Sequence, residues 1–363
     1  MMSKKSHSDM RKAALYILLF PSLLLICGCN KEPDAAFPKE KVVNIRTSVE
    51  SGSSATKGHI TGTSLSNYGI FVCLNGTTDT PHKANSWNLS ASYNSTEAKW
   101  KYYYVSNLTT GALGGGVDSF TLTEREDGLT ADLYAYAPYR QDAFNNDPTR
   151  IPYSLDLKNG VLYYDRDIRD LLYATQNGTS NMNLDPSSTD PLEAEFTFRH
   201  AFALLVFNFR LLHSGNTCRI VRATISKNPD YTGEPKANLY ISGTFNAITG
   251  TFNDDAVPVQ SFYSHSADYH TNVSSTSSEV PLYMMIVPTE FNDNELTITF
   301  DLNGQDSRSL PLMNADVRHS DNTAGFKSGY VYNFHYTIDN YVRFDGITVN
   351  ENWPEVDLGS TEI

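Results

Sequence analysis

The fold is decided by the stretch Phe196-Thr197-Phe198-Arg199-His200-Ala201-Phe202-Ala203-Leu204-Leu205-Val206-Phe207-Asn208-Phe209-Arg210-Leu211. Apolar residues occupy its even positions up to His200 and its odd positions from Leu205 onward. A period of two is typical of β-strands, because successive side chains point to opposite faces. The change of phase indicates either one long strand with a bulge or corner near residues 201–203, or two strands joined tightly. In both cases the stretch predicts a β core.

Strand patterns continue on both sides of this stretch. Residues 42–49 alternate between apolar and polar side chains, as a half-buried strand does, and residues 68–74 are apolar on both faces, as in a central strand. Residues 100–105 and 129–139 also read as strands. Further strands are predicted at residues 219–225, 239–245, 280–287, 296–302, 330–338 and 344–349. The window with the best helical spacing, residues 166–174, is charged at nearly every step, so we interpret it as a turn leading to a short strand.

The chain is long enough for two domains. Residues 178–191 are rich in Asn, Ser, Thr, Asp and Pro and come directly before the apolar stretch, which is typical of a domain boundary. The sequence therefore predicts an all-β protein with little helix, made of two β-sandwich domains at residues 42–190 and 191–363.

The amino terminus carries an export signal. Four basic residues precede an apolar run that begins at Ala13, and the run ends in Ile26-Cys27-Gly28-Cys29. This ending looks like a bacterial lipobox, which implies cleavage after Gly28 and lipid attachment to Cys29. Residues 1–28 are then a lipoprotein signal peptide and residues 29–41 a tether. The alternative is an ordinary cleaved signal with a coincidental cysteine, and both interpretations exclude the cytoplasm.

Charge and cysteine content narrow the class of protein. The 28 basic and 41 acidic residues give a net charge of −13, so we expect no nucleic-acid partner. Outside the lipobox there are two cysteines, Cys73 and Cys218. They are open to two interpretations, a pair of buried free thiols or one disulfide, of which we favour the thiols.

Catalytic and metal-binding patterns are weak throughout. His200 lies within an apolar strand, where a hydrogen-bonded core histidine is the simpler interpretation. Asp165, Asp167 and Asp170 could form a carboxylate cluster, yet the glycine and the distal glutamate of a calcium loop are missing. Asp293 and Glu295 read as turn residues. With no nucleophile, zinc or phosphate-loop motif in the mature chain, we expect no enzyme, no cofactor and no metal.

An ordered set of short motifs resembles the fimbrillin family of Bacteroidetes. After the lipobox and tether come Arg46 in the first strand, then Gly69-Ile70-Phe71-Val72, Asp170-Leu171-Leu172-Tyr173-Ala174, Phe198-Arg199-His200-Ala201, Gly329-Tyr330-Val331-Tyr332, Ile347 and Trp353. The resemblance spans nearly the whole mature chain. It implies two transthyretin-like β-sandwich domains in tandem and a role as subunit, anchor or tip of a surface pilus.

The resemblance also implies a mechanism. Family members reach the outer membrane as lipoproteins, an arginine-directed protease cuts within or just after the first strand, and another subunit fills the resulting groove with an extended segment, a form of strand addition. Arg46-Thr47 fits the cut bond by position. A solvated arginine is the simpler interpretation of Arg46, and Lys57 is another candidate cut site.

The implied partners are other fimbrial subunits, outer-membrane lipid through Cys29, and a host or bacterial surface receptor. Lys31-Glu32-Pro33-Asp34 resembles surface-export signals of the phylum and favours the cell exterior. Candidate donor segments are residues 344–349 and 354–363. The second has few apolar anchors, which favours a minor, tip or anchor role over the main shaft.

A second hypothesis is a monomeric surface lipoprotein that binds glycan for a nutrient-uptake system. Trp87, Trp100 and the tyrosines at residues 102–104 could stack on sugar rings. Packing within the protein explains these aromatic residues equally well.

Overall fold

The structure is a computed structural model of the full chain. It describes residues 40–49, 65–75, 87–107, 112–123, 130–140, 147–155, 170–177, 181–188, 192–263, 271–302, 308–313, 317–319, 324–339 and 341–350. The signal peptide, Gly28, Cys29, Lys57, Asp165, Asp167 and residues 354–363 lie outside this part of the chain. The tether is described from residue 40 onward.

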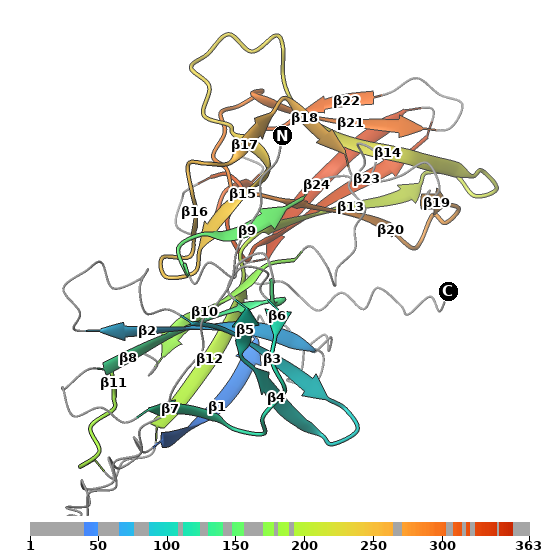
Figure 1. Ribbon diagram of the computed structural model, residues 1–363. Coiled ribbons are helices and arrows are strands. Elements are labelled where there is room, and N and C mark those ends of the chain that lie inside the picture. Colours follow the sequence, from blue (N-terminus) through green and yellow to red (C-terminus); the bar gives the residue numbers. More distant parts are fainter. Residues whose placement is uncertain are drawn as a thin grey trace, which may run out of the picture. The chain divides into compact units, whose positions relative to one another are not determined.

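The first half of the chain builds one large sheet (Figure 1). Its strands are β1 (Glu40–Val49), β2 (Asn67–Asn75), β3 (Trp87–Asn94), β4 (Lys99–Tyr103), β7 (Phe120–Thr123), β8 (Thr130–Ala137), β10 (Leu172–Asn177), β11 (Met182–Asn183) and β12 (Leu192–His200). The spatial order is β4-β3-β2-β8-β10-β12-β1-β7, with β11 paired to β8. A separate two-stranded ribbon joins β5 (Val105–Asn107) to β6 (Ala112–Leu113).

Three further sheets consist of strands from the second half of the chain, together with β9. One contains β13 (Ala203–Leu211), β20 (Val280–Ile286), β23 (Val331–Ile338) and β24 (Val342–Asn350), in the order β20-β13-β23-β24. Another contains β14 (Cys218–Lys227), β18 (Ser261–Tyr263), β19 (Thr271–Val273), β21 (Leu296–Leu302) and β22 (Arg308–Pro311). A third contains β9 (Ile151–Ser154), β15 (Leu239–Asn246), β16 (Thr251–Phe252) and β17 (Val257–Val259).

The all-β prediction is confirmed, and no α-helix occurs among the residues that the structure describes. Over the same residues, no helix is long and apolar enough to span a membrane. The strands predicted from residues 42–49, 68–74, 129–139 and 330–338 are β1, β2, β8 and β23. The tandem transthyretin-like architecture stays a prediction.

The phase change in the apolar stretch marks a junction between sheets. β12 ends at His200 and β13 begins at Ala203, so the interpretation as two tightly joined strands is confirmed. β12 belongs to the large sheet and β13 to the sheet of β23. The connecting Ala201 and Phe202 are fully buried. The predicted boundary between residues 190 and 191 stays a prediction, and it precedes β12.

The central strands of the large sheet are buried on both faces, as the sequence predicts for β2. Ile70 and Val72 enter one apolar cluster, whereas Phe71 and Tyr136 enter another. The first cluster also brings β4 to β7, since the rings of Tyr102 and Phe120 lie 6.1 Å apart. The two ends of the strand order therefore approach each other across this core.

Two sheets of the second half pack face to face. Phe207 and Phe209 of β13 contact Phe300 of β21, with ring centroids 5.6 and 5.0 Å apart. All three side chains are fully buried. This is the packing of a β-sandwich, with alternate residues of each strand directed into the shared core.

β9 connects the two halves of the chain. It lies in sequence between β8 and β10 but pairs antiparallel with β15, with Tyr153 opposite Gly243 (Figure 1). Tyr153 also packs edge-on against Phe252, with ring centroids 4.9 Å apart. The sequence patterns did not predict this pairing.

Among the described residues, Cys73 and Cys218 form no disulfide. Cys73 is fully buried in β2, and Cys218 is half-buried at the start of β14. The favoured interpretation of the pair is thus confirmed, and burial raises the pKa of the Cys218 thiol.

Candidate functional site

The first strand occupies an unusual position in the large sheet. β1 lies between β12, to which it is parallel, and β7, to which it is antiparallel. Its pairing with β12 runs from Val43 to Val49, whereas its pairing with β7 covers only residues 40–43. Among the described residues, positions 44–49 are therefore held by a strand on one side only.

Side chains of β1 alternate between the core and solvent, as the period of two predicts. Val43 is 4% exposed and belongs to the core, and Ile45 is half-buried against it. Asn44, Arg46 and Ser48 are exposed on the other face. β1 thus fills a slot between β12 and β7 with a few apolar anchors and main-chain pairing, as an added strand does.

The amino-terminal end of β1 carries extra anchors. The Lys41 ammonium donates to the carbonyl oxygens of Asp185 and Ser188 at 2.7 and 3.0 Å. The Thr121 hydroxyl on β7 donates to a Glu40 carboxylate oxygen at 2.9 Å. These contacts add to the pairing with β7 at residues 40–43.

The candidate cut site lies beyond those anchors. Arg46 is exposed and stands opposite Glu195 of β12, and Thr47 is half-buried opposite Phe196. Both residues fall in the part of β1 that β7 does not pair. The exposed Arg46 agrees with the solvated-arginine interpretation, while Lys57 lies outside the described residues.

β4, the strand at the other end of the sheet, is flanked by residues 114–118, a segment that we call the strap. It runs along β4, with Gly114 N–H donating to the Tyr104 carbonyl and two main-chain bonds of 2.9 Å linking Val117 to Tyr102. A Cβ added at Gly116 would lie 2.7 Å from the Tyr103 ring, so glycine permits this close approach. The strap leads directly into β7.

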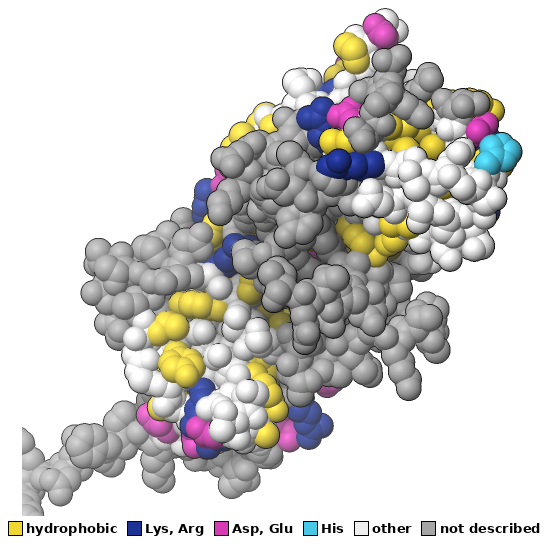
Figure 2. Space-filling model, turned by 90° about the vertical axis from the view of Figure 1, so that its right-hand side faces the viewer, with side chains coloured by type: hydrophobic (Ala, Val, Ile, Leu, Met, Phe, Trp, Pro, Cys, Tyr) yellow, Lys and Arg dark blue, Asp and Glu magenta, His cyan; other side chains and the backbone are white. Residues whose placement is uncertain are grey.

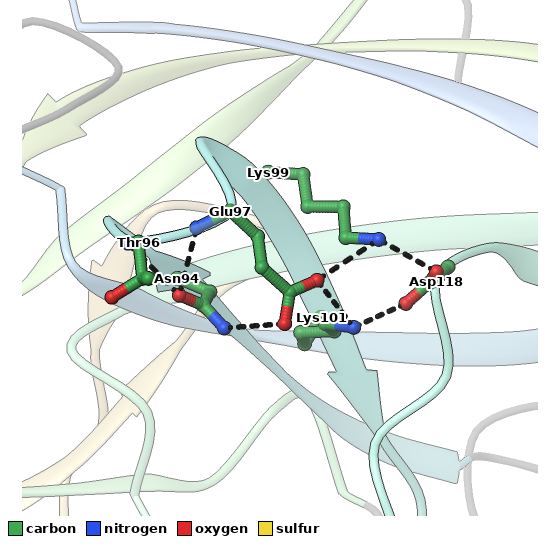
Figure 3. Close-up of polar contacts among 6 residues, drawn as sticks. All are labelled: Asn94, Thr96, Glu97, Lys99, Lys101 and Asp118. Atoms are coloured by element: carbon green, nitrogen blue, oxygen red, sulfur yellow. Dashed lines mark hydrogen bonds and ion pairs between the residues drawn. The ribbon is translucent and has the colours of Figure 1, made fainter.

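Four charges lock the strap to the β3–β4 hairpin (Figure 3). The two oxygens of Asp118 accept from Lys99 at 2.7 Å and from Lys101 at 2.5 Å. Glu97 contacts the same two lysines at 3.0 and 2.9 Å. Asn94 caps the turn by donating to Glu97 at 3.0 Å. Exposed pairs are weak singly, but a shared network of alternating charges fixes its geometry better.

The network shifts the titration of all four groups. Hydrogen bonds from Lys101 and then Lys99 lower the pKa of Asp118 to about 2, and the same lysines lower the pKa of Glu97. In return, Asp118 and then Glu97 raise the pKa of Lys101 and of Lys99. The network is therefore fully charged at neutral pH.

These shifts predict a pH dependence. A carboxyl whose pKa is lower in the folded chain stabilises it above the unfolded pKa, which is about 3.9 for Asp, and loses that effect as pH falls toward about 2. We expect Asp118→Asn to lower the unfolding midpoint by a constant amount above about pH 5. The difference should vanish near pH 2, as urea titrations at several pH values can measure. A difference that persists unchanged at pH 2 would contradict the assignment.

Charges elsewhere are mixed. Among the described side chains on the face drawn in Figure 2, positive and negative groups lie beside one another. These described side chains give no support for nucleic-acid binding, in agreement with the acidic net charge.

The candidate donor segments fall into two classes. Residues 344–349 lie in β24, which pairs antiparallel with β23 and forms one end of its sheet. Phe344, Ile347 and Val349 pack against the core of that sheet. This segment is thus used within its own fold, whereas residues 354–363 lie outside the described part of the chain.

The residues considered for catalysis have structural roles. His200 Nδ1 lies 2.6 Å from Asp170 Oδ2, and both side chains are buried where β12 ends. Glu295 is 2% exposed and accepts main-chain N–H groups of Ala237 and Asn292 at 2.5 and 2.8 Å. Within the described residues no three His, Cys, Asp or Glu side chains are grouped to hold a metal ion.

The His200–Asp170 pair should stabilise the junction between sheets. Asp170→Leu removes the hydrogen bond at Nδ1 while the imidazole stays buried, so we expect a loss of about 1–3 kcal/mol in the free energy of unfolding. His200→Leu combined with Asp170→Leu should cost less than the sum of the single changes, because no polar group is then left buried. Denaturant unfolding of the four chains measures this coupling, and strict additivity would contradict it.

The aromatic residues considered for sugar stacking are largely packed within the protein. Tyr102 is 7% exposed, and the Trp100 ring lies edge-on to Tyr68 and Tyr93 at 4.8 and 5.5 Å. Tyr103 and Tyr104 are half-buried, with Tyr103 against Gly116 of the strap. Trp87 begins β3. This packing explains most of the cluster without a ligand.

Sequence reasoning missed the strap and its lock. The only local indication is the alternation of Glu97, Lys99 and Lys101 on one hairpin, followed by three glycines and Asp118. That pattern reads equally well as a solvated edge and a loop. The pairing of Asp118 with both lysines depends on the path of the strap, which no periodicity encodes.

The profile of a family described as fimbrillin-like matches residues 63–353. Among solved structures, a candidate cell adhesion protein from Bacteroides uniformis is 13% identical, with 86% of this chain and 98% of that chain covered and a TM-score of 0.47. A fimbrial protein from Bacteroides vulgatus is 12% identical, with 86% and 98% covered and a TM-score of 0.46.

The tip fimbrial protein Mfa3 from Porphyromonas gingivalis is also similar. It is 10% identical, with 87% of this chain and 100% of that chain covered and a TM-score of 0.40. No curated protein sequence matches the chain.

Proposed function

The chain belongs to the fimbrillin-like family, and on this premise we propose that it is a structural or adhesive component of a bacterial surface fimbria. Membership in a family of fimbrial proteins means that the chain is not an enzyme. The buried structural roles of His200 and Glu295 agree with this.

The proposed route begins with export as a lipoprotein. The signal peptide ends at Gly28, Cys29 receives the lipid, and the acyl chains hold the protein in the outer membrane with the fold at the cell surface. The two lipobox cysteines, Cys27 and Cys29, flank the cut, and the tether gives the fold distance from the lipid.

The proposed assembly step is strand exchange at the slot of β1. A protease cuts Arg46-Thr47, β1 leaves, and a segment of another subunit takes its place between β12 and β7. The observation that carries this proposal is the staggered pairing of β1, which pairs with β7 at residues 40–43, with β12 at residues 43–49, and on one side only around an exposed Arg46. A strand held by a few apolar anchors and main-chain bonds can be replaced by another of similar pattern.

The proposed position in the fimbria is minor, at the tip or anchor. A shaft subunit must both accept and donate a strand. Here residues 344–349 already pair with β23, and the segment at 354–363 offers few apolar side chains to fill a slot. The chain is thus better suited to accept a strand than to donate one. A tip position also agrees with adhesion to a receptor on a host or bacterial surface.

The glycan-binding alternative is supported less well. Its aromatic residues include Trp100 and Tyr102, which pack against Tyr68 or within the core. No described feature of the chain favours it over the fimbrial role.

The two functions can be separated by fractionating the cell surface. We expect the chain in sheared filaments, in heat-dissociable complexes with other fimbrial subunits, detected by mass spectrometry of unheated gel bands. A chain that is only monomeric in the membrane fraction, and that binds a panel of oligosaccharides saturably, would overturn the fimbrial proposal in favour of the alternative.

A further inference from the structure

β7, which borders β1 on the side opposite β12, has few strand contacts of its own in the described part of the sheet. In the described part of the large sheet, β7 has β1 as its strand partner. If β1 leaves, β7 loses those main-chain hydrogen bonds. A four-residue strand without a partner keeps little order by itself.

Two kinds of contact remain for β7 after such a loss. Phe120 and Leu122 are 1% and 2% exposed, and the Phe120 ring faces Tyr102 of β4. The second contact is the strap, which ends two residues before Phe120. Its main-chain bonds between Val117 and Tyr102 tie the start of β7 to β4.

The charged lock acts at the last residue of the strap. Asp118 bridges Lys99 and Lys101, which lie two residues apart and so project from the same face of β4 (Figure 3). The Lys101 side chain is only 18% exposed. The bridge therefore fixes the strap along β4 at the point where the chain turns into β7.

We propose that the strap, locked by Asp118 between Lys99 and Lys101, holds β7 in place as the second wall of the slot once β1 has left. The inference rests on the proposed strand exchange. Asp118 and the two lysines are then positioning residues, which touch neither the cut bond nor the incoming strand. Their effect is preorganisation, because an acceptor whose wall is already ordered loses less conformational freedom when a strand enters.

The effect of the lock on β7 should depend on whether β1 is present. In the uncut chain β1 orders β7 directly, so the lock should matter little for β7. In the cut chain with β1 displaced, the lock becomes the main support outside the core. If the ion pairs of Asp118 stabilised only the β3–β4 hairpin, their loss would change the hydrogen-exchange protection of β7 equally in the uncut and the cut chain.

The test uses the full chain cut at Arg46 by an arginine-specific protease, with a fluorescent synthetic peptide of residues 40–46 as the incoming strand. Amide hydrogen exchange of β7 is measured in the uncut and cut chains, together with the rate of peptide incorporation. The variant is Asp118→Ala. The matched control is Asp301→Ala, which removes another exposed ion pair between neighbouring strands, the one with Arg222 of β14.

We expect Asp118→Ala to leave β7 protection unchanged in the uncut chain, to lose it in the cut chain, and to slow incorporation of the peptide several-fold. Asp301→Ala should behave like the parent chain. Gly116→Val tests the same strap without changing a charge, because its side chain would collide with the Tyr103 ring, and it should reproduce the loss. Thermal unfolding of each uncut variant confirms that it folds.

Equal β7 protection in the cut parent and cut Asp118→Ala chains would overturn the inference. Failure of the proposed function has a different signature, since the parent chain would then not take up the peptide at all. In that case a difference in β7 protection would still support the role of the strap.

Discussion

Replacement of Arg46 by alanine is expected to keep the chain at its full mature length and to prevent its incorporation into fimbriae. Arg46 is the exposed residue of β1 that precedes the candidate cut bond, and the change removes the side chain that an arginine-directed protease recognises. Because Arg46 points to solvent, the fold should be unaffected, within about 0.5 kcal/mol of the free energy of unfolding. The measurement is the amino-terminal sequence of the surface protein beside an unheated gel.

Lys57→Ala is the matched control for this experiment, since Lys57 is the other candidate cut site. If the Arg46→Ala variant is processed normally and the Lys57→Ala variant is not, the cut lies at Lys57 and not at Arg46. Normal assembly of both variants at full mature length would contradict the need for cleavage altogether.

Phe207→Ala should give the largest loss of stability. Phe207 lies on β13 and its ring is fully buried. The ring centroid lies 5.6 Å from that of Phe300 on β21 and 5.4 Å from that of Phe334 on β23. Removing a buried aromatic side chain leaves a cavity and costs about 3–5 kcal/mol. Urea unfolding followed by aromatic fluorescence measures the loss.

Leu212→Ala provides the comparison, because Leu212 follows the same strand and is 44% exposed. Its change should stay within about 0.5 kcal/mol. Equal effects of the two substitutions would contradict the assignment of Phe207 to the core.

Much of the fold follows from local patterns. The alternation in residues 42–49 predicted β1 and its solvent face with Arg46. The phase change near Ala201 indicated either a bulge in one long strand or two joined strands, and the second is the junction between β12 and β13. Both are consequences of the two-residue period of a strand, which places each side chain on one face. These features require no knowledge of the partner strands.

Pairing over long distances could not be predicted in the same way. β1 is parallel to β12, although about 150 residues separate them in sequence. β9 leaves the order of the large sheet to pair with β15, and its four residues are too few to show a pattern. Hydrophobic period tells which face of a strand is buried but not which strand lies beside it.

The candidate site was predicted in part. Arg46 and the first strand were identified from the sequence and the family resemblance, but the one-sided pairing beyond Val43 emerged only from the register with β7. The lock of Asp118 with Lys99 and Lys101 was missed because all three side chains look like ordinary solvated charges in sequence. These contacts form only because the strap brings Asp118 back to β4.

The amino terminus of the protein in the assembled fimbria tests the proposed strand exchange most directly. Intact mass and terminal sequencing of the chain, taken from filaments sheared off the native cell surface, determine it. A chain that starts at Thr47 is the predicted result, since strand exchange at the slot requires the loss of β1 up to Arg46. A chain in those filaments that still starts at acylated Cys29, with β1 intact, would contradict it.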